Sequence, residues 1–234
     1  MVAGMAQVAI ITGAGAGIGK AIALKLAARG YALTLVGRTR TTLEQVKKET
    51  GGDALVIIGD VGQFATARRV VAATVERFGG VDVLVNNAGV AKSQAIEQTD
   101  EQLVQETFAT NVFGPAYLIA SVWPHFQHAK KGCVINVSSL SARDPFAHLL
   151  AYAASKSALE SLTRSMRAER GEMALRVFNV RPGAVETALL RRLYSERERP
   201  ARFALAPQQV AEKVVQCIEG VIPDDADPIE ITAA

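Results

Sequence analysis

Three polar side chains in the second half of the chain have the types and the spacing of a proton-transfer site. Tyr152 and Lys156 stand four residues apart in the sequence AYAASKSAL, and Ser139 lies thirteen residues before Tyr152. Residues with the first of these separations share one face of a helix. A phenol has a pKa of about 10, and a neighbouring ammonium favours its deprotonated form. We therefore expect Lys156 to lower the pKa of Tyr152, so that the phenol can exchange a proton with a carbonyl or alcohol oxygen. Ser139 is expected to donate a hydrogen bond to that oxygen.

A glycine-rich sequence near the start of the chain predicts a phosphate-binding turn. Residues 12–19 read TGAGAGIG and lie between an apolar run and a helical stretch. Glycine lets the backbone approach a pyrophosphate closely, and the following helix offers free N–H groups to it. The spacing T-G-x-x-x-G-x-G fits at Gly13, Gly17 and Gly19, whereas G-x-G-x-x-G does not. We expect this turn, together with Ile18, to bind a dinucleotide; a glycine-rich turn without a ligand is the alternative.

The end of the second apolar run, residues 31–37, indicates which dinucleotide binds. An NAD site usually carries Asp or Glu there to hold the adenosine ribose, but this chain has Gly37 and Arg38. A guanidinium offers a planar pair of donors to a 2′-phosphate, and Arg40 can add a second charge. The sequence therefore predicts NADP(H) in preference to NAD(H). An exposed arginine at the end of a strand is the alternative.

Two more motifs follow later apolar runs. Asp60 and Val61 come after residues 54–59, and the carboxylate either accepts a hydrogen bond from the adenine amino group or caps the next helix. The sequence NNAG closes the run 81–86, at the edge where a doubly wound sheet has its ligand crevice. We expect its residues to tie neighbouring strands and line the ribose, with a plain turn as the alternative; they are Asn86, Asn87, Ala88 and Gly89.

Short apolar runs that alternate with helical stretches predict the elements that position these groups. The expected strands are residues 7–12, 31–37, 54–59, 81–86, 133–139, 175–182 and 228–232, and the expected helices are 18–29, 63–78, 101–126, 151–170 and 208–219. The strands are rich in Val, Ile and Leu without clean alternation, which is typical of parallel strands covered on both faces. We therefore predict one α/β domain over residues 1–234, a doubly wound parallel sheet (Rossmann fold) of about seven strands with helices on both faces.

The segment 184–206 differs from the rest of the chain. Its mixed charges accompany an apolar set at Ala188, Leu189, Leu190, Leu193 and Tyr194, which predicts a short amphipathic helix followed by an irregular piece. Because Glu196 and Glu198 interleave with its arginines, we interpret the charge run as a solvated face rather than a nucleic-acid site.

Composition excludes several other classes of protein. The chain is 49% apolar and 6% aromatic, and its formal net charge of +3 argues against nucleic acid or an anionic membrane as a partner. Cys133 and Cys217 lack the spacing of a disulfide or zinc framework. No stretch approaches the ~18 apolar residues of a membrane span, and the N-terminal residues lack the basic segment of a signal peptide. We expect a cytoplasmic location.

Together these motifs resemble the short-chain dehydrogenases/reductases, in their compact single-domain branch. The resemblance covers residues 7 to 220 and includes TGAGAGIG, NNAG, Asn111 in FATNVFG, Ser139 in NVSSLSA, and Tyr152 with Lys156. It implies that Lys156 also holds the nicotinamide ribose and that Asn111 holds a water completing a proton relay from Tyr152. It further implies cofactor contacts near the nicotinamide from Pro182, Gly183, Val185 and Thr187.

The same resemblance implies a homodimer or homotetramer, with the long helices near 101–126 and 151–170 packing between subunits, and a variable substrate lid at 184–206.

The chain departs from the family pattern at two places. Many NADP-preferring members carry a basic residue where this chain has Ala16, and the tail DPIEITAA lacks the glycine-rich ending of many tetrameric members. The prediction of NADP therefore depends on Arg38.

The histidines do not indicate a metal site. His125 and His128 stand three residues apart near the end of a helical stretch, but no carboxylate lies nearby in sequence. His148 precedes Tyr152 in DPFAHLL, a loop that often shapes the substrate pocket in the family.

We therefore expect an NADP-dependent oxidoreductase that interconverts a carbonyl and a secondary alcohol. Phe146, Leu149 and Leu150, with the apolar set of 184–206, predict a small to medium, mainly apolar substrate. The alternative from another class is a non-catalytic NADP(H)-binding sensor or scaffold on the same fold. An epimerase or dehydratase is a third interpretation, which the chain length disfavours.

Overall fold

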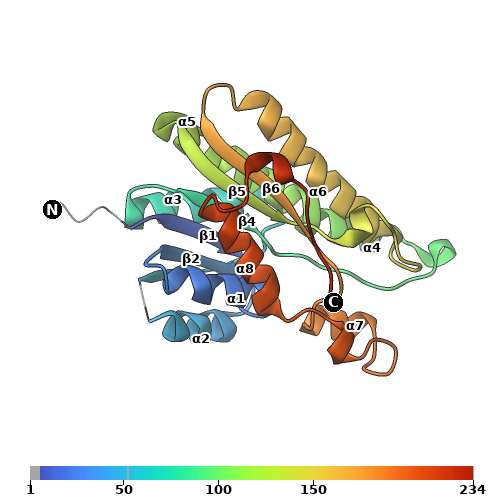
Figure 1. Ribbon diagram of the computed structural model, residues 1–234. Helices are drawn as coiled ribbons and strands as arrows, with labels where there is room; N and C mark the ends of the chain where they lie inside the picture. The colour runs from blue at the N-terminus through green and yellow to red at the C-terminus, as the bar shows by residue number, and fades with distance from the viewer. Residues whose placement is uncertain (1–5, 52, 234) are drawn as a thin grey trace.

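A parallel sheet forms the centre of the molecule (Figure 1). The computed structural model describes residues 6–51 and 53–233; residues 1–5, for which we predict no signal peptide, lie outside that part. In the described residues the sheet has seven strands in the order β3-β2-β1-β4-β5-β6-β7. Their bounds are β1 Val8–Thr12, β2 Ala32–Gly37, β3 Ala54–Ile58, β4 Val83–Asn86, β5 Lys131–Val137, β6 Ala174–Pro182 and β7 Ile229–Ile231. All pairings are parallel, which confirms the predicted fold class.

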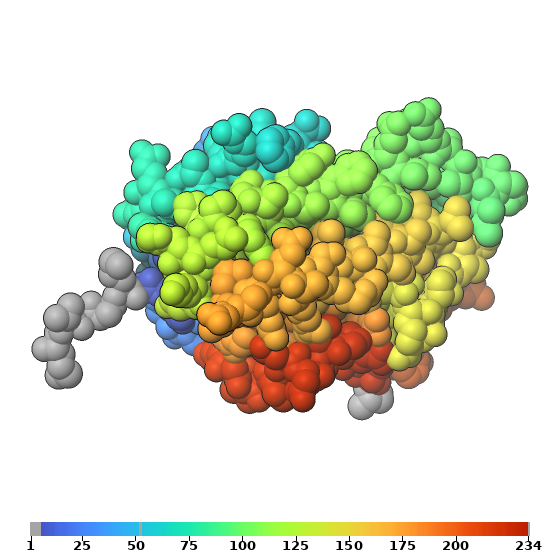
Figure 2. Space-filling model, turned by 90° about the horizontal axis from the view of Figure 1, so that it is seen from above, coloured from blue at the N-terminus to red at the C-terminus, as the bar shows by residue number. Residues whose placement is uncertain are grey.

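Helices cover both faces of this sheet and explain why its strands are apolar on both sides. One face packs against α1 (Gly17–Ala27), α2 (Arg40–Thr50) and α8 (Pro207–Ile218). The other packs against α3 (Phe64–Phe78), α5 (Gly114–Ala129) and α6 (Leu150–Glu169), which cross that face in Figure 2. Every residue of β1 is buried, as the unbroken apolar run predicts.

The strand order reverses between β1 and β4, and this reversal decides where a ligand can bind. Strands β2 and β3 lie on one side of β1, whereas β4 and the strands after it lie on the other. The loops that leave the carboxyl ends of β1 and β4 therefore diverge and open a crevice between them. They contain the glycine-rich turn and the NNAG sequence, so the topology brings the two motifs together.

Two helical predictions differ from the structure. The expected helix 101–126 is interrupted: α4 (Glu101–Phe108) is followed by a π-helical turn at Ala109–Phe113, and α5 begins after it. Pro115 has no amide hydrogen and leaves the carbonyl of Asn111 without its usual α-helical donor. Helix α2 was not predicted, because only Leu43 and Val46 of it are buried and the rest is polar.

The segment 184–206 contains the predicted short helix, α7 (Ala188–Leu193), followed by an irregular stretch. Thr187 caps this helix, since its hydroxyl accepts a hydrogen bond from Leu190 N at 3.3 Å. An isolated bridge between Val185 and Leu205 closes the segment at its base. Among the described residues, no helix has the length and apolar character to cross a membrane.

Candidate active site

A cavity of about 710 Å³ opens at the carboxyl edge of the sheet. This volume is in the range of small-molecule and cofactor sites in proteins. Most of the residues predicted for the site line it: Gly13, Gly17, Ile18, Arg38, Asn87, Ala88, Gly89, Ser139, Tyr152, Lys156, Pro182, Gly183, Val185 and Thr187. Gly19, Asp60, Val61 and Asn111 are not part of its wall.

Two glycines of the first turn are required by close approach of the backbone. Gly13 has φ +64, and a Cβ atom there would lie 2.8 Å from Asn87 Nδ2. At Gly19 a Cβ would lie 2.3 Å from the carbonyl oxygen of Gly13, because α1 starts directly against the turn that precedes it. Ala16, at the N-cap, offers no side-chain hydrogen bond to the first N–H groups of α1. These amides therefore remain available to an anion at the glycine turn.

The NNAG sequence ties three strands together, as expected. Asn87 Nδ2 donates to the carbonyl of Thr12 at 2.8 Å, and the Thr12 hydroxyl accepts from the amides of Asn87 and Ala88 at 2.9 and 3.0 Å. Asn86 Nδ2 donates to Asn136 Oδ1 at 2.9 Å and so links β4 to β5. The crevice between β1 and β4 is thereby held at a fixed width.

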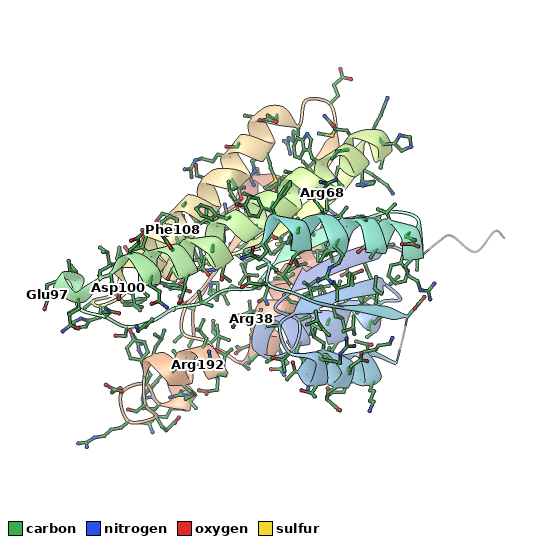
Figure 3. The ribbon with its side chains drawn as sticks, turned by 180° about the vertical axis from the view of Figure 1, so that it is seen from behind. Arg38, Arg68, Glu97, Asp100, Phe108 and Arg192 are labelled. Atoms are coloured by element: carbon green, nitrogen blue, oxygen red, sulfur yellow. The ribbon has the colours of Figure 1, made fainter. Side chains whose placement is uncertain are left out.

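Arginine side chains approach the cavity from two elements (Figure 3). Arg38 follows β2 and Arg192 lies on α7, and both line the wall. Gly37 also lines it, so no side chain stands where an NAD site would have its carboxylate. Arg40 is directed elsewhere: it lies 3.8 Å from Glu44 in an exposed pair and is not part of the wall.

Tyr152, Lys156 and Ser139 meet at the end of the cavity away from Arg38. The first two lie on α6, with Lys156 Nζ 5.7 Å from the centroid of the Tyr152 ring. Lys156 is buried, and its ammonium donates to the carbonyl of Val137 at 2.7 Å. Ser139 follows β5, and its hydroxyl accepts from Ser141 N at 3.1 Å. The predicted i,i+4 face of a helix thus exists and is turned to the cavity.

The pKa of Tyr152 moves in the opposite direction to the one predicted from sequence. Burial raises it, and an interaction with the Ser139 hydroxyl offsets this only in part. Burial also lowers the pKa of Lys156 to about 8, against a smaller opposing effect of Glu160. Both shifts have the same origin, since a low-dielectric site disfavours the charged form of either group. Tyr152 is therefore a neutral phenol at neutral pH.

Behind Lys156, one turn further along α6, Glu160 forms a buried ion pair with Arg181 on β6. Its carboxylate accepts from Arg181 Nε at 2.7 Å and from Arg181 Nη2 at 2.6 Å, and it also accepts from the Ser138 hydroxyl at 2.6 Å. The negative charge of Glu160 also favours the protonated form of Lys156, which offsets part of the effect of burial. Glu160 thus anchors the face of α6 that carries Tyr152 and Lys156 to β6 and to the end of β5.

Asn111 lies in the π-helical turn and is completely buried. Its side chain accepts from Val90 N and donates to Val90 O and to Ser155 Oγ, each at 2.9 Å. The amide group therefore fixes the loop after NNAG to α6 and does not face the cavity. A Cβ atom placed on Gly89 would nevertheless lie 3.5 Å from Asn111 Oδ1 and 3.6 Å from Lys156 Nζ.

Three predicted positions have local structural roles. Asp60 is exposed and its carboxylate accepts from Gly62 N at 2.9 Å, while Gln63 is the N-cap of α3. The carboxylate thus closes a turn ahead of the helix rather than capping it. Val61 is buried in the core against Gly114. His148 is exposed and is not part of the cavity wall.

Sequence reasoning missed part of the wall. Thr232 and Ala233, which follow β7, line the cavity, as do Thr39 and Thr42 beside Arg38. The signal for the tail was present, because a parallel strand at 228–232 must deliver its last residues to the same sheet edge as β6. Arg199 and Phe203 also line the wall, but no local pattern places them there. In the part of the chain that the structure describes, no group of three His, Cys, Asp or Glu residues is arranged to hold a metal.

Comparison with known proteins supports the same assignment of the fold. The family model described as short chain dehydrogenase matches residues 7–198. The chain is 32% identical over 222 residues to a sepiapterin reductase of Chlorobaculum tepidum, a match that covers 91% of this chain and 90% of the relative. It is 32% identical over 222 residues to an L-xylulose reductase of Caenorhabditis elegans, covering 93% and 88% of the two chains.

Solved structures are similar over nearly the whole chain. Levodione reductase superposes with a TM-score of 0.90 at 26% identity, covering 97% of this chain and 96% of that one. An alcohol dehydrogenase from Thermococcus sibiricus, complexed with 5-hydroxy-NADP, gives a TM-score of 0.83 at 29% identity over 96% and 94% of the chains. A 3-ketoacyl-(acyl-carrier-protein) reductase from Brucella melitensis, complexed with NADH, gives 0.89 at 29% identity over 97% of both.

Proposed function

The chain belongs to the short chain dehydrogenase family, and on that premise we propose that it is an NADP-dependent oxidoreductase that interconverts a carbonyl and a secondary alcohol. The observation that carries the proposal is the single cavity that joins the glycine turn and Arg38 at one end to Ser139, Tyr152 and Lys156 at the other. A dinucleotide in this cavity extends from the phosphate-binding turn to the proton donor, which is the arrangement that hydride transfer needs.

The residues of the cavity fit a nicotinamide dinucleotide. Gly13 and Gly17 line the cavity at the glycine turn, and the uncapped start of α1 offers amides to a pyrophosphate. Asn87, Ala88 and Gly89 line the middle of the cavity, and Pro182, Gly183, Val185 and Thr187 line its far wall. When bound there, the cofactor supplies or accepts the hydride. Asp60 and Val61 are outside the wall, so we assign the adenine end to the residues around Arg38.

Preference for NADP(H) over NAD(H) is supported by charge. Arg38 is exposed on the cavity wall beside Gly37, and the wall contains no Asp or Glu among the described residues. A 2′-phosphate would meet a guanidinium and no opposing carboxylate. Thr39, on the same part of the wall, adds a hydroxyl donor, whereas the Thr42 hydroxyl donates to the carbonyl of Thr39 at 3.0 Å.

In the reduction direction Tyr152 donates its proton to the carbonyl oxygen, to which Ser139 also donates a hydrogen bond. Burial keeps the phenol protonated until that moment, so the role requires that positive charge stabilise the phenolate as it forms. Lys156 supplies that charge and, on the proposed mechanism, also contacts the nicotinamide ribose. Asn111 is proposed to hold the relay water from its position in the π-helical turn, with its side chain fixing the loop at Val90.

We also propose that 184–206 is the substrate lid and that the substrate is small to medium and largely apolar. Leu189, Leu190, Leu193 and Tyr194 line the cavity from this segment, and Phe146 and Leu149 line it from the loop before α6. Leu150, predicted with them, is exposed and is not part of the wall.

A homodimer or homotetramer in the cytoplasm completes the proposal. Phe113 is exposed between α4 and α5, with its ring centroid 6.4 Å from that of Tyr117. Phe64 is also exposed, with its ring centroid 5.3 Å from that of Tyr117, and this cluster of aromatic rings supports assembly through the helices predicted to pack between subunits. Cys133 and Cys217 are both buried free thiols, which fits a reducing compartment.

The test is NADPH consumption against a panel of aldehydes, diketones, ketoesters and cyclic ketones, run beside a direct titration of the protein with NADPH and NADH. We expect turnover of at least one carbonyl class and tighter binding of NADPH. Binding without turnover on any substrate would favour the sensor or scaffold instead, and loss of binding would contradict the cofactor assignment.

A further inference from the structure

Positive charge is concentrated on the cavity wall. Four cationic side chains line it, namely Arg38, Lys156, Arg192 and Arg199, and no Asp or Glu among the described residues does. The proposed function uses Arg38 for the cofactor phosphate and Lys156 beside Tyr152. It gives no role to Arg192, which is exposed on α7, or to Arg199, which is half-buried in the irregular part of 184–206.

Arg199 is held between two aromatic rings at the substrate side of the cavity. Its guanidinium carbon lies 5.8 Å from the ring centroid of Phe146 and 5.8 Å from that of Tyr194. Phe146 belongs to the loop that leads into the helix carrying Tyr152, whereas Tyr194 follows α7. Stacking on aromatic faces orients a guanidinium and leaves the donors at its edge free.

The carboxylates of 184–206 are engaged with other groups. Glu186 and Glu196 both pair with Arg191, the first through an Nε–Oε1 hydrogen bond of 2.7 Å and the second at 3.3 Å. Glu198 accepts from the Ser195 hydroxyl at 2.7 Å. Within the described residues the Arg199 guanidinium has no carboxylate partner. The hydrogen bonds of this residue are made by its backbone, from Arg191 Nη2 to the Arg199 carbonyl at 2.9 Å and from Arg199 N to the Ser195 carbonyl at 3.0 Å. A half-buried cation with this environment is complementary to an anion that arrives with the ligand.

We propose that Arg199 forms an anion subsite for the substrate, and that the preferred substrates are oxo acids and the corresponding hydroxy acids. The inference rests on the proposed function and narrows its substrate class. The substrate carboxylate binds the edge of the guanidinium. The apolar chain that joins the carboxylate to the carbonyl group contacts Phe146, Leu149 and Leu193, which line the same cavity.

The chemical step leaves that carboxylate unchanged. Hydride passes from NADPH to the carbonyl carbon, the carbonyl π electrons move to oxygen, and Tyr152 gives that oxygen its proton. The products are the hydroxy acid and NADP⁺, and solvent returns the proton to Tyr152. Arg199 binds and orients the substrate without exchanging a proton.

The experiment compares linear oxo acids of increasing chain length, each with its methyl ester, in the wild type, Arg199→Gln and Arg199→Lys. One charge-assisted hydrogen bond corresponds to about 10- to 100-fold in binding. We expect kcat/KM of the wild type to favour the best acid over its ester by about that factor. Arg199→Gln should remove the preference, because KM for the acid rises while kcat/KM for the ester stays within about twofold of the wild-type value. Arg199→Lys should restore part of the preference.

Arg197→Gln is the matched control, because Arg197 is exposed on the same segment and is not part of the cavity wall. It should keep the full preference for acids. Equal use of acid and ester by the wild type would overturn the subsite while leaving the reductase proposal intact. An equal loss for acid and ester in Arg199→Gln would show instead that Arg199 only fastens the lid between Phe146 and Tyr194.

If neither acid nor ester is reduced, binding separates the two proposals. The NADP⁺-loaded protein is titrated calorimetrically with hexanoate and with hexanamide. Stronger binding of hexanoate that disappears in Arg199→Gln would support the subsite even as the reductase proposal failed. Equal binding of hexanoate and hexanamide, or no binding of either, would overturn the anion subsite.

Discussion

The ammonium of Lys156 lies 5.7 Å from the centroid of the Tyr152 ring, one helical turn away on α6. Both groups are in a site where burial disfavours charge, so the pKa of the phenol is raised and that of the ammonium is lowered to about 8. The pair therefore combines a neutral acid with a cation that is lost on mild alkalinisation. The pH dependence of the reaction should therefore follow the titration of Lys156.

Alkaline pH should slow carbonyl reduction. Lys156 is protonated below its pKa of about 8 and loses its charge as the pH rises through that value. Because the neutral amine cannot stabilise the phenolate of Tyr152, kcat/KM should fall above about pH 8. A pH profile of kcat/KM tests this, and a value that stays level up to the ordinary lysine pKa of about 10.4 would contradict it.

Removing the charge of Glu160 should move that alkaline fall to lower pH. The carboxylate favours the protonated form of Lys156, so in Glu160→Gln the ammonium should be lost earlier. The variant also removes the buried carboxylate partner of Arg181, which keeps only Glu230 at 3.2 Å, and this should cost about 1–3 kcal/mol of unfolding free energy. Urea unfolding and the pH profile are both measured, with Glu169→Gln at the exposed end of α6 as the control. An unchanged pH profile would show that Glu160 has only a structural role.

Reversing the charge at position 38 should change cofactor preference. Arg38→Asp places a carboxylate against the 2′-phosphate, so we expect the Kd of NADPH to rise at least about 10- to 100-fold more than that of NADH. Arg40→Asp is the control, since Arg40 pairs with Glu44 away from the cavity wall. Equal weakening of the two cofactors by Arg38→Asp would show that Arg38 does not bind the phosphate.

A single methyl group at Gly19 should disrupt the glycine turn. Its Cβ would lie 2.3 Å from the carbonyl oxygen of Gly13, so the start of α1 must shift. We expect Gly19→Ala to lose about 1–3 kcal/mol of unfolding free energy and to weaken NADPH binding. Gly80→Ala, where a Cβ would meet no atom within 4 Å, should change neither. Normal NADPH affinity in Gly19→Ala would remove the turn from the proposed cofactor site.

The fold could be predicted from the sequence because its signals are local and repeated. Each strand buried on both faces requires an apolar run, and all of the expected strands are present. Helix α2 escaped prediction because it buries only Leu43 and Val46. The interruption before α5 escaped prediction as well, although Pro115 marks it.

The candidate site was predictable where a motif follows the end of a strand, or where two residues spaced four apart share one face of a helix. Ser139 and Asn87 reach the cavity because parallel strands end at one edge of the sheet, and Tyr152 reaches it because it shares one face of α6 with Lys156. Arg199 could not be predicted, since its position depends on how 184–206 folds back over Phe146. The pKa of Tyr152 was predicted in the wrong direction, because sequence shows a neighbouring charge but not the burial that outweighs it.

The central claim is that Tyr152 is the proton donor in a reductase that uses NADPH. Tyr152→Phe tests it most directly, with turnover and NADPH affinity measured on the same preparation. Removing a general acid should lower kcat by about 100-fold or more, while the Kd of NADPH stays nearly unchanged because the ring and its packing remain. Near-wild-type turnover in Tyr152→Phe would contradict the account.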